Sequence, residues 1–442
     1  MARLGWRSAP RDSLAQWDEL RRFADAAHRD GLTRTVVCGM GGSSLAPHVL
    51  ASTSDNPSLS VLDSTDPSAV LAVARAPDVE RTLFLVASKS GSTVETLAFY
   101  YFLSHFLAPR VGPEQFVAIT DPGSPLEALA RDRGFRGVFR HPPDVGGRYA
   151  ALTVIGMLPA ALLDLDGRAL LERALEVDVE AAQERGARLA TAVLAGRDKL
   201  VLRPPGRIAR LADWVEQLVA ESTGKEGRGA IPVVDDPIAT PRSDGEIVSE
   251  FAEDPGTLGA QFLEWEYATL ELCNRLGVNA FDQPDVDEAK ALARAELAQP
   301  PGADPPPLLP TLTPAALTRA ARPGDYLAIL AYLPPTPGIT AQLQAVRAAW
   351  SRDLGCVTTL GFGPRYLHST GQLHKGGPNT GIFLVVTVDD AEDAEIPVLE
   401  TTFGRLKRAQ ARGDMRALIA RGRRVAHVHL ARAADVSGLA SS

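Results

Sequence analysis

Uninterrupted apolar runs, alternating with helical patterns, constrain the fold of this 442-residue chain more than any other feature. In the first half they are rich in β-branched and aromatic residues, and they cover residues 34–39, 59–63, 82–87, 115–120 and 137–141. The runs are apolar throughout instead of alternating with polar residues, as expected of strands that are buried on both faces. They predict a parallel sheet with helices on both sides, which is an α/β fold.

The second half repeats this alternation. Its candidate strands are residues 199–205, 326–333, 355–363 and 381–388. We therefore predict two doubly wound, flavodoxin-like α/β domains. The predicted boundaries are residues 1–165, with a short N-terminal helix, and residues 166–442, which end in a helix and a strand. Prolines crowd residues 299–314, so we expect a surface connection there, inside the second domain, and no central helix or strand.

Composition narrows the class of protein. The net charge is −8 and the basic residues are mostly dispersed. Because binding of nucleic acid requires clustered Lys and Arg, we expect no nucleic-acid partner. Cys38, Cys273 and Cys356 lie far apart, which suits reduced thiols and excludes a zinc framework. There is no signal-peptide pattern, and the longest uncharged run, residues 149–163, is shorter than a membrane span. We expect a cytoplasmic protein without a membrane partner.

A serine-rich loop, SKSGST at residues 88–93, follows the third predicted strand. Ser92 and Glu95, three residues apart, predict a capping box that starts the next helix at Ser92. The capping box leaves the other hydroxyls, the lysine and the glycine unexplained. Hydroxyl groups beside a helix N-terminus are suited to binding a phosphate. The loop by itself leaves both interpretations open.

Two further strand–loop–helix junctions favour the phosphate. They are residues 36–47, VVCGMGGSSLAP, and residues 118–130, AITDPGSPLEALA. In the latter, Ser124 is the predicted N-cap, Pro125 the first helical residue and Glu127 the partner in a capping box. Loops that follow parallel strands meet at the carboxyl edge of the sheet, where ligands bind. Together the three loops predict a phosphorylated small molecule as the ligand.

A dinucleotide is the competing ligand. Gly39 and Gly41 begin a G-x-G-x-x-G pattern, and Asp63 ends the next strand, where an acid that binds ribose would lie. The third glycine position is Ser44, so the match is partial. A P-loop is not present either, because the Gly-Lys pair at residues 224–225 is followed by Glu instead of Ser or Thr.

A second group of candidate residues lies in a predicted helix at residues 207–222. Its apolar stripe should face the core, and it consists of Ile208, Leu211, Val215, Leu218 and Val219. Gln217 and Glu221 share the opposite face, and Gly224 is predicted to end the helix in a left-handed conformation. Glu221 then lies in the last turn, where the helix dipole disfavours a carboxylate. Such a broken local rule points to function, although a solvated surface glutamate is the simpler alternative.

These stretches resemble the phosphoglucose isomerase family over about residues 33–431, most closely the isomerase half of bifunctional transaldolase/phosphoglucose isomerase proteins. The motifs are GMGGSSLAP (39–47), SKSGSTVET (88–96), VGGRYA (145–150), QLVAESTGKEG (217–227) and HSTGQLHKG (368–376). Residues 277–290 and 406–430 look closest to the bifunctional proteins. The resemblance implies two sugar-isomerase (SIS) domains, and we expect no transaldolase barrel in this chain.

The resemblance also implies an activity. It is the glycolytic and gluconeogenic interconversion of D-glucose 6-phosphate and D-fructose 6-phosphate through a cis-enediol, by a homodimer without metal or cofactor. Glu221 would be the base that shuttles the proton, Arg148 the cation that stabilises the enediolate, and Lys375 the lysine that opens the sugar ring. The residues implied to bind the substrate are Gly42, Ser43, Ser88, Lys89, Ser90, Ser92, Thr93, Gly147 and Gln217.

One departure from the family concerns ring opening. Many members carry a histidine in a G-x-x-G-Q-H segment, but residues 255–266 have none, and Gln261 falls nearest to that position. His368 and His374, on the segment that carries the lysine, are the candidate substitutes. Two other functions stay open. One is an isomerase that also accepts mannose 6-phosphate, and the other is a non-catalytic protein that senses sugar phosphates.

Overall fold

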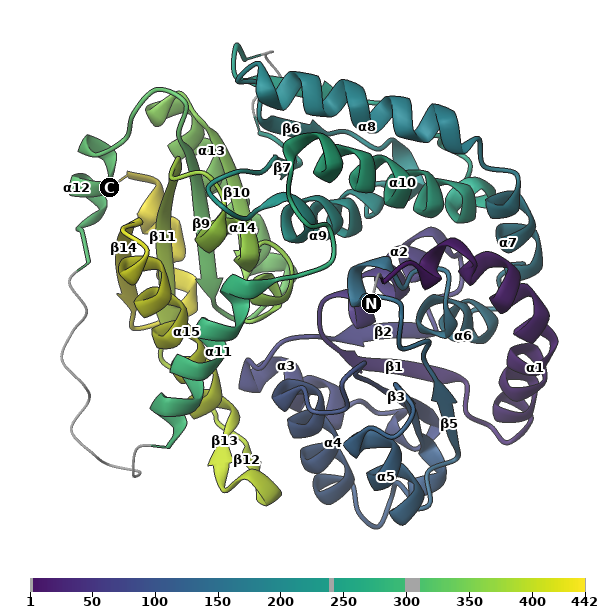
Figure 1. The fold of residues 1–442 in the computed structure, drawn as a ribbon. Coiled ribbons are helices and arrows are strands. Elements are labelled where there is room, and N and C mark those ends of the chain that lie inside the picture. Colours follow the sequence, from purple (N-terminus) through teal and green to yellow (C-terminus); the bar gives the residue numbers. More distant parts are fainter. Residues whose placement is uncertain (1–2, 238–241, 299–310, 442) are drawn as a thin grey trace.

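The computed structural model describes residues 3–237, 242–298 and 311–441. Its first half contains a parallel five-stranded sheet in the order β2-β1-β3-β4-β5 (Figure 1). The strands are β1 (Arg34–Gly39), β2 (Leu59–Leu62), β3 (Thr82–Ala87), β4 (Phe116–Thr120) and β5 (Gly137–Arg140). All five lie where the apolar runs predicted them. The strand order is the flavodoxin-like one, and it reverses between β1 and β3.

Helices cover both faces of this sheet, as the apolar runs predicted. One face carries α1 (Ala9–Arg29), α2 (Gly42–Thr53) and α6 (Val154–Leu162), and the other α3 (Pro67–Ala74), α4 (Val94–Phe106) and α5 (Pro125–Asp132). Successive strand residues point to opposite faces. Leu83 and Leu85 of β3 accordingly pack on the α1 side, whereas Phe84 and Val86 pack on the α4 side.

The second half builds two parallel sheets. One has the order β7-β6-β8 and the other the order β10-β9-β11-β14. Their strands are β6 (Lys199–Leu202), β7 (Ile231–Val234), β8 (Gly245–Val248), β9 (Tyr326–Tyr332), β10 (Val357–Phe362), β11 (Gly381–Val388) and β14 (Arg424–Leu430). The α/β class with parallel sheets is confirmed. The sequence did not reveal β7 and β8, because β7 contains a proline and β8 begins with a glycine and a glutamate.

The helices of the second half cover these sheets. They are α7 (Gly167–Leu175), α8 (Val179–Leu194), α9 (Leu211–Thr223), α10 (Leu258–Leu276), α11 (Pro284–Leu297), α12 (Pro314–Arg319), α13 (Pro337–Leu354), α14 (Gly371–Gly376) and α15 (Phe403–Ala420). α13 packs on one face of the four-stranded sheet and α15 on the other. A short antiparallel hairpin, β12 (Glu395–Ile396) with β13 (Thr401–Thr402), precedes α15.

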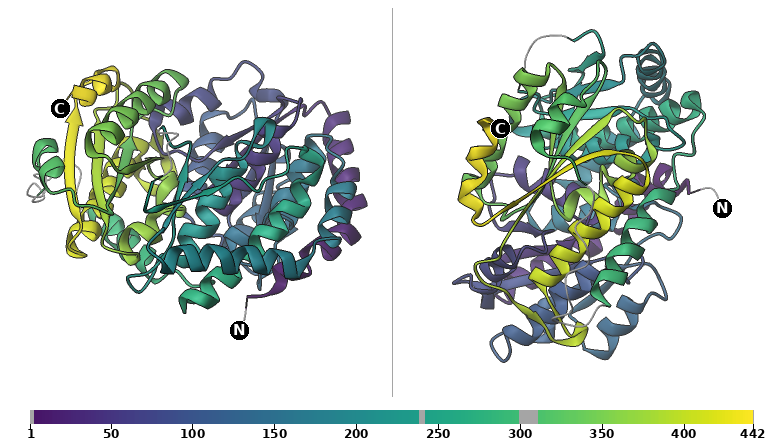
Figure 2. Two further views of the ribbon diagram at one scale, coloured as in Figure 1. Left: turned by 90° about the horizontal axis from the view of Figure 1, so that it is seen from above. Right: turned by 90° about the vertical axis from the view of Figure 1, so that its left-hand side faces the viewer.

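The two halves are in contact along a shared apolar core. Trp17 of α1, Trp214 of α9 and Phe262 of α10 belong to the same buried cluster. The division of the chain at residue 165 therefore stays a prediction. α15 and β14, in yellow, lie on the side of the molecule away from α1, in purple (Figure 2). Of the predicted proline-rich connection, residues 299–310 lie outside the described residues.

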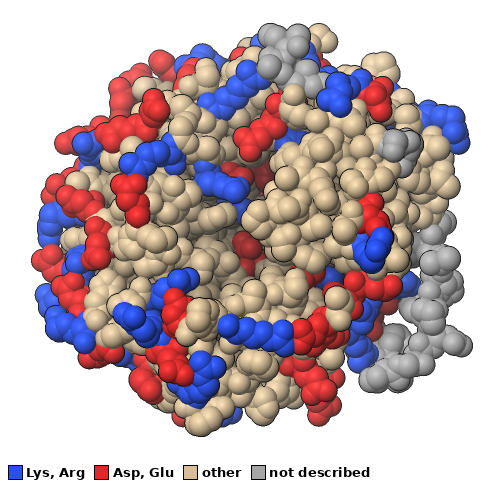
Figure 3. All heavy atoms as spheres, turned by 180° about the vertical axis from the view of Figure 1, so that it is seen from behind, with Lys and Arg blue, Asp and Glu red and all other residues tan. Residues whose placement is uncertain are grey.

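The surface carries both charges. On the face seen in Figure 3, Lys and Arg side chains are interspersed with Asp and Glu, and the face is hollowed near its centre. Within the described residues, no helix has the length and the apolar character needed to cross a membrane.

Candidate functional site

A cavity of about 720 Å³ collects side chains from both halves of the chain. The first half contributes the loops after β1 and β3 and the turn at Gly147–Tyr149, and the second half contributes α9, α11, α14, α15 and the turn at Arg365–His368. Every candidate substrate-binding residue from the sequence lines this cavity, as do Glu221, Arg148, Lys375 and His368. His374 does not.

Two glycines let three of these segments converge. A Cβ atom on Gly42 would lie 2.0 Å from the carbonyl oxygen of Gly147. Gly41 has a φ of +55°, and a Cβ atom there would lie 2.6 Å from the carbonyl oxygen of His368. Side chains are therefore excluded at Gly41 and Gly42 by the approach of other backbone segments. The same packing brings Ser43, the turn that carries Arg148, and His368 to one edge of the cavity.

The serine-rich loop lies between β3 and α4. The Oγ of Ser88 lies 2.8 Å from Oγ1 of Thr93, and the Oγ of Ser90 lies 3.0 Å from that of Ser92. Gly91 has a φ of +67°, the left-handed conformation that glycine adopts readily. Ser88, Ser90, Ser92 and Thr93 thus line the cavity next to the N-terminus of α4, which is a suitable place for an anion.

The predicted capping box of this loop is wrong. α4 begins at Val94, its N-cap is Thr93, and among the described residues no side chain caps it. Ser92 bonds within the loop instead, and Glu95 turns into the interior toward the second half. The N–H groups at the start of α4 are therefore left for a ligand or for solvent.

Lys89 is held at the rim of the serine-rich loop. Its Nζ lies 2.5 Å from Oδ2 of Asp121 and donates to the carbonyl oxygen of Pro143 at 3.1 Å. His141 also contacts Asp121, through Nδ1 at 3.1 Å from Oδ1. Burial raises the pKa of the Asp121 carboxyl, but the hydrogen bonds with His141 and Lys89 outweigh burial and bring the pKa below its ordinary value. An ionised Asp121 therefore orients the lysine.

The third predicted loop contributes less than expected. Ser124 caps α5 by accepting from the N–H of Glu127 at 3.1 Å, as predicted. The Glu127 carboxylate, however, accepts from the N–H of Gly123 at 2.5 Å instead of from the N-cap residue. Of residues 118–130, Asp121 lines the cavity and Ser124 does not.

Glu221 lies in the cavity wall, and the structure contradicts the alternative of a solvated surface glutamate. Glu221 is 7% exposed. Oε1 lies 3.1 Å from Nη1 of Arg148, and Oε2 accepts from Nε2 of Gln217 at 3.0 Å. Gln217 also donates to the carbonyl oxygen of His368 at 2.8 Å, so this amide joins α9 to the turn that carries the histidine.

Gly224 does end α9, but the predicted left-handed conformation is wrong. Its φ is −76°. The position excludes a side chain for another reason, because a Cβ atom would lie 2.4 Å from Cα of Leu373 in α14. Glycine thus lets α14, which carries Lys375, pack closely against the end of the helix that carries Glu221.

Arg148 is buried and fixed from several directions. Its Nε donates to Oγ of Ser222 at 2.8 Å, and its Nη2 donates to the carbonyl oxygens of Ala280 at 2.6 Å and Asp282 at 3.2 Å. Nη1 donates to Oε1 of Gln283 at 3.2 Å. The guanidinium is therefore held in one orientation before any ligand binds, with one edge turned toward Glu221. Arg148 is 4% exposed, so its contact with Glu221 is not a surface salt bridge.

His368 is tied to Glu95 and Gln410. Nε2 of His368 lies 2.9 Å from Oε1 of Glu95, and the same oxygen accepts from Nε2 of Gln410 at 2.7 Å. Burial acts to raise the pKa of the Glu95 carboxyl, but the charge of His368 and its hydrogen bond outweigh burial, so the pKa lies below its ordinary value. Glu95 is therefore an anion that faces the histidine. The sequence did not identify Glu95 or Gln410 as site residues, because Glu95 fitted a capping box and the segment of Gln410 carried a family resemblance without a role for that residue.

Two positions expected from the sequence lie elsewhere. His374 is surrounded by the aromatic rings of Tyr326, Tyr366 and Phe383 and is missing from the cavity wall. Burial lowers the pKa of its imidazole well below the ordinary value, so the side chain is neutral. Gln261, the residue nearest to the missing histidine of the family, bonds to the backbone of Ala252 and also lies outside the cavity.

Lys375 and Lys290 both line the cavity. The Nζ of Lys375 lies 2.5 Å from Oδ1 of Asp414, and both side chains are 1% exposed. Lys290, on α11, contributes to lowering the pKa of Glu95 through its charge. Its segment had carried a family resemblance without a residue role, so Lys290 is a site residue that the sequence did not reveal.

No metal site is evident among the described residues, because no group of three or more His, Cys, Asp or Glu side chains is placed to hold an ion. Asp63, the candidate acid for a dinucleotide ribose, lies 3.4 Å from Nε of Arg365 and is not part of the cavity wall. The arrangement instead places a carboxylate, a fixed guanidinium and a hydroxyl-rich loop around one cavity.

Comparisons with known proteins show which sequences and structures this chain is similar to. Residues 25–230 match the model of the family described as phosphoglucose isomerase. The chain is 34% identical over 235 residues to a glucose-6-phosphate isomerase of Rubrobacter xylanophilus, covering 47% of this chain and 54% of that protein. It is 33% identical over 244 residues to one of Carboxydothermus hydrogenoformans, covering 49% and 51%. The chain thus spans about half the length of the curated relatives it matches.

A solved structure supports the fold over a longer stretch. The glucose-6-phosphate isomerase of Chlamydia trachomatis superposes with a TM-score of 0.54 at 20% identity, covering 66% of this chain and 75% of that chain. The part matched by the family model contains the serine-rich loop, Arg148 and Glu221. His368, Lys375 and Gln410 lie beyond it.

Proposed function

We propose that this chain is a sugar-phosphate isomerase that interconverts D-glucose 6-phosphate and D-fructose 6-phosphate. The observation that carries the proposal is that Glu221 and Arg148 face each other, at 3.1 Å, in the cavity that the serine-rich loop also lines. A base, a fixed cation and an anion site are the groups that an aldose–ketose isomerisation of a phosphorylated sugar requires. The similarity to glucose-6-phosphate isomerases supports the same substrates.

The serine-rich loop binds the phosphate in this proposal. Ser88, Ser90, Ser92 and Thr93 offer hydroxyl groups, and the start of α4 offers backbone N–H groups with the positive end of the helix dipole. Lys89, held by Asp121, adds a positive charge at the rim. With the phosphate anchored there, the sugar extends toward the turn of Gly147 and toward Glu221 across the same cavity.

Glu221 moves the proton between two adjacent carbons. Its carboxylate removes the proton from C2 of the open-chain aldose, the electron pair forms the C1–C2 double bond, and negative charge collects on O1. The same carboxyl group returns the proton to C1 while O2 becomes the carbonyl oxygen, and a proton that passes from O2 to O1 completes the exchange. Gln217 holds Oε2 of Glu221 and so limits its rotation.

Arg148 stabilises the charge of the cis-enediolate. Because its guanidinium is already held by Ser222 and by two backbone carbonyl groups, it loses little freedom when the charge appears. An interaction that is stronger in the transition state than in the bound substrate lowers the barrier and leaves substrate binding nearly unchanged.

His368 is our candidate for opening the sugar ring. It lines the cavity, and the Glu95 carboxylate fixes the orientation of its ring. Lys375 is the second candidate, although its ammonium group is compensated by Asp414 in a buried ion pair. Lysine paired in this way suits a positioning role better than the transfer of its proton to the sugar.

Two alternatives remain and have distinct requirements. Dual activity on glucose and mannose 6-phosphate requires a wall near C2 that tolerates both configurations. A non-catalytic protein that binds sugar phosphates requires the serine-rich loop but not the pair of Glu221 and Arg148, and the close contact of that pair therefore favours an enzyme. A cytoplasmic homodimer, with no nucleic-acid or membrane partner, is part of the proposal.

A coupled assay tests the proposal on the parent protein and on Glu221→Gln, with fructose 6-phosphate and mannose 6-phosphate as separate substrates. We expect activity of the parent on fructose 6-phosphate and a loss of about 10³-fold in kcat for Glu221→Gln. Titration calorimetry with inorganic phosphate is the control, and its dissociation constant should be the same in both proteins. Equal turnover by the two proteins contradicts the role of Glu221, and binding without turnover by the parent supports the sensor.

A further inference from the structure

One face of α15 carries a buried polar stripe. Lys407, Gln410 and Asp414 are spaced three and four residues apart, so they lie above one another on the helix. Their exposures are 2%, 4% and 1%. Buried polar groups are costly unless they have partners, and each member of this stripe has partners on other segments of the chain.

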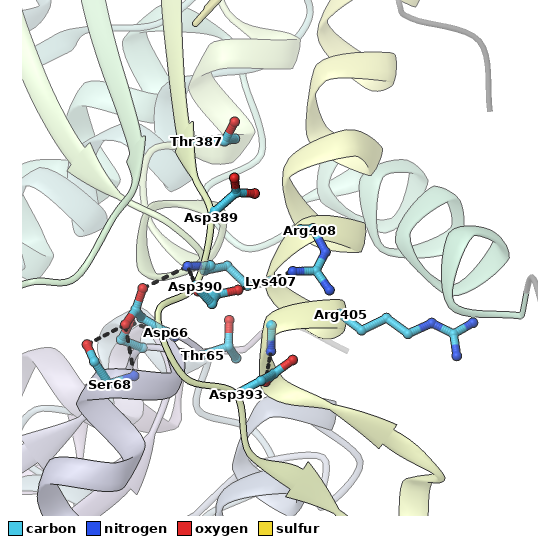
Figure 4. A network of polar contacts seen from close by, with 12 residues as sticks. Thr65, Asp66, Ser68, Thr387, Asp389, Asp390, Asp393, Arg405, Lys407 and Arg408 are labelled. Carbon is cyan, nitrogen blue, oxygen red and sulfur yellow. Dashed lines mark hydrogen bonds and ion pairs between the residues drawn. The ribbon is translucent and has the colours of Figure 1, made fainter. Parts of the chain in front are cut away.

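Lys407 anchors the first turn of the stripe to the first half of the chain. Its Nζ lies 2.8 Å from Oδ2 of Asp66 and also contacts Oδ1 of Asp390. Asp66 in turn caps α3 by accepting from the N–H of Ser68 at 3.0 Å. Figure 4 shows Lys407 reaching from α15 toward Asp66 and Asp390, whereas Arg405 points away from them. α15 is thereby fixed against the helix that follows β2.

Gln410 lies one turn further along α15, beside Glu95. The hydroxyl of Thr65 donates to its Oε1 at 2.8 Å, and this bond leaves the amide N–H groups facing the other way. Nε2 of Gln410 then donates to Oε1 of Glu95 at 2.7 Å. The same carboxylate oxygen contacts Nε2 of His368 at 2.9 Å.

We propose that Gln410 is a positioning residue, which holds the Glu95 carboxylate in the orientation that fixes the imidazole of His368 in the cavity. The inference rests on the proposed function in one respect, namely that His368 acts on the sugar ring. Glutamate has rotatable side-chain bonds, and a second donor on the same oxygen removes the freedom of the carboxylate to turn away from the histidine. Thr65 fixes the amide of Gln410, and the ion pair of Lys407 with Asp66 fixes α15. Contacts with the first half of the chain thereby hold Gln410 in place at the site.

The kinetic test is a double-mutant cycle on the full chain with Gln410→Leu and Glu95→Gln. Leucine removes both hydrogen-bonding groups of Gln410 at a similar volume. We expect Gln410→Leu to lower kcat on cyclic fructose 6-phosphate about tenfold, with KM nearly unchanged. Because both residues act through His368, the double variant should lose little more than the more affected single variant. Losses that multiply in the double variant would overturn the proposal.

A spectroscopic test does not depend on turnover. In ¹⁵N NMR of the ring nitrogens, Gln410→Leu should shift the resonances of His368, and the matched control Gln261→Leu should not. Gln261 is a buried amide on α10, bonded to Ala252, so its loss reports on packing alone. Unchanged His368 resonances in Gln410→Leu would overturn the proposal even in an active protein. The His368 resonances could shift in Gln410→Leu although the parent has no isomerase activity. That result would refute the proposed function and leave the positioning role of Gln410 standing.

A milder variant covers the case in which Gln410→Leu fails to fold. Thr65→Val keeps the amide of Gln410 but removes the hydroxyl that orients it. We expect a smaller loss of kcat, which disappears when Glu95 is already glutamine. A loss of the same size in both backgrounds would contradict a role that passes through Glu95.

Discussion

Nη1 of Arg148 lies 3.1 Å from Oε1 of Glu221, which joins a turn of the first half to a helix of the second half inside one cavity. Arg148 and Glu221 are 73 positions apart in the sequence. Only the packing of the halves brings them together. The proposed chemistry depends on this contact, since the carboxylate moves the proton and the guanidinium stabilises the resulting charge.

Arg148→Lys should lower kcat about 10²-fold or more and change KM little. Lysine keeps the charge but cannot reproduce the fork that Ser222, Ala280 and Gln283 hold in place. Steady-state kinetics on fructose 6-phosphate measure both constants. Arg207→Lys is the control, because Arg207 makes an exposed ion pair with Asp55. A large rise in KM at constant kcat would assign Arg148 to substrate binding instead.

Ser92→Asp should weaken phosphate binding without unfolding the protein. Ser92 is exposed in the serine-rich loop, and a carboxylate there repels an anion at the start of α4. We expect at least about a tenfold rise in the dissociation constant for inorganic phosphate, measured by titration calorimetry. Ser60→Asp adds the same charge at an exposed position of β2 and serves as the control. Equal affinities of the two variants would place the phosphate elsewhere.

Gly42→Ala should destabilise the protein, and Gly147→Ala should not do so to a similar extent. A methyl group on Gly42 would lie 2.0 Å from the carbonyl oxygen of Gly147, whereas the added carbon at Gly147 would have no described atom within 4 Å apart from those of its own turn. We expect a loss of about 2 kcal/mol in the free energy of unfolding for Gly42→Ala, from urea denaturation. A similar loss of unfolding free energy in both variants would contradict this explanation, because only the methyl group on Gly42 would meet the other loop.

Glu95 should make stability sensitive to acid. Its pKa in the folded protein is lowered from the ordinary value of 4.5, so folding favours the ionised form. The stabilisation is present above about pH 4.5 and is lost as the pH falls below that value toward the folded pKa. The difference in unfolding free energy between parent and Glu95→Gln should therefore shrink from pH 6 to pH 3. A difference that stays constant, or that grows in acid, would contradict this assignment.

The sequence predicted the elements of the first half well because its signals there are local. A strand buried on both faces must be apolar throughout, and the runs at residues 34–39 and 82–87 satisfy this requirement without knowledge of the rest of the chain. Ser124 also caps α5 as predicted, since a cap needs only a residue three positions away.

The failures concern residues whose partners are distant in the sequence. Glu95 has the spacing of a capping box, but contacts with His368 and Gln410, 273 and 315 residues away, decide its orientation. Gly224 has the position of a left-handed cap, yet the approach of Leu373 explains it. His374 is a candidate for ring opening because of its imidazole, but its position on α14 places it among aromatic rings instead. Long-range packing cannot be read from a single local pattern.

The transfer of a labelled hydrogen tests the central claim most directly. Glucose 6-phosphate that carries deuterium on C2 is converted in ordinary water, and NMR measures the isotope on C1 of the fructose 6-phosphate formed. If Glu221 carries the proton through an enediol, solvent hydrogen will replace part or all of the deuterium, and Glu221→Gln will form almost no product. An unchanged rate in Glu221→Gln would contradict the account, and complete retention of deuterium on C1 in that variant would indicate a hydride shift instead.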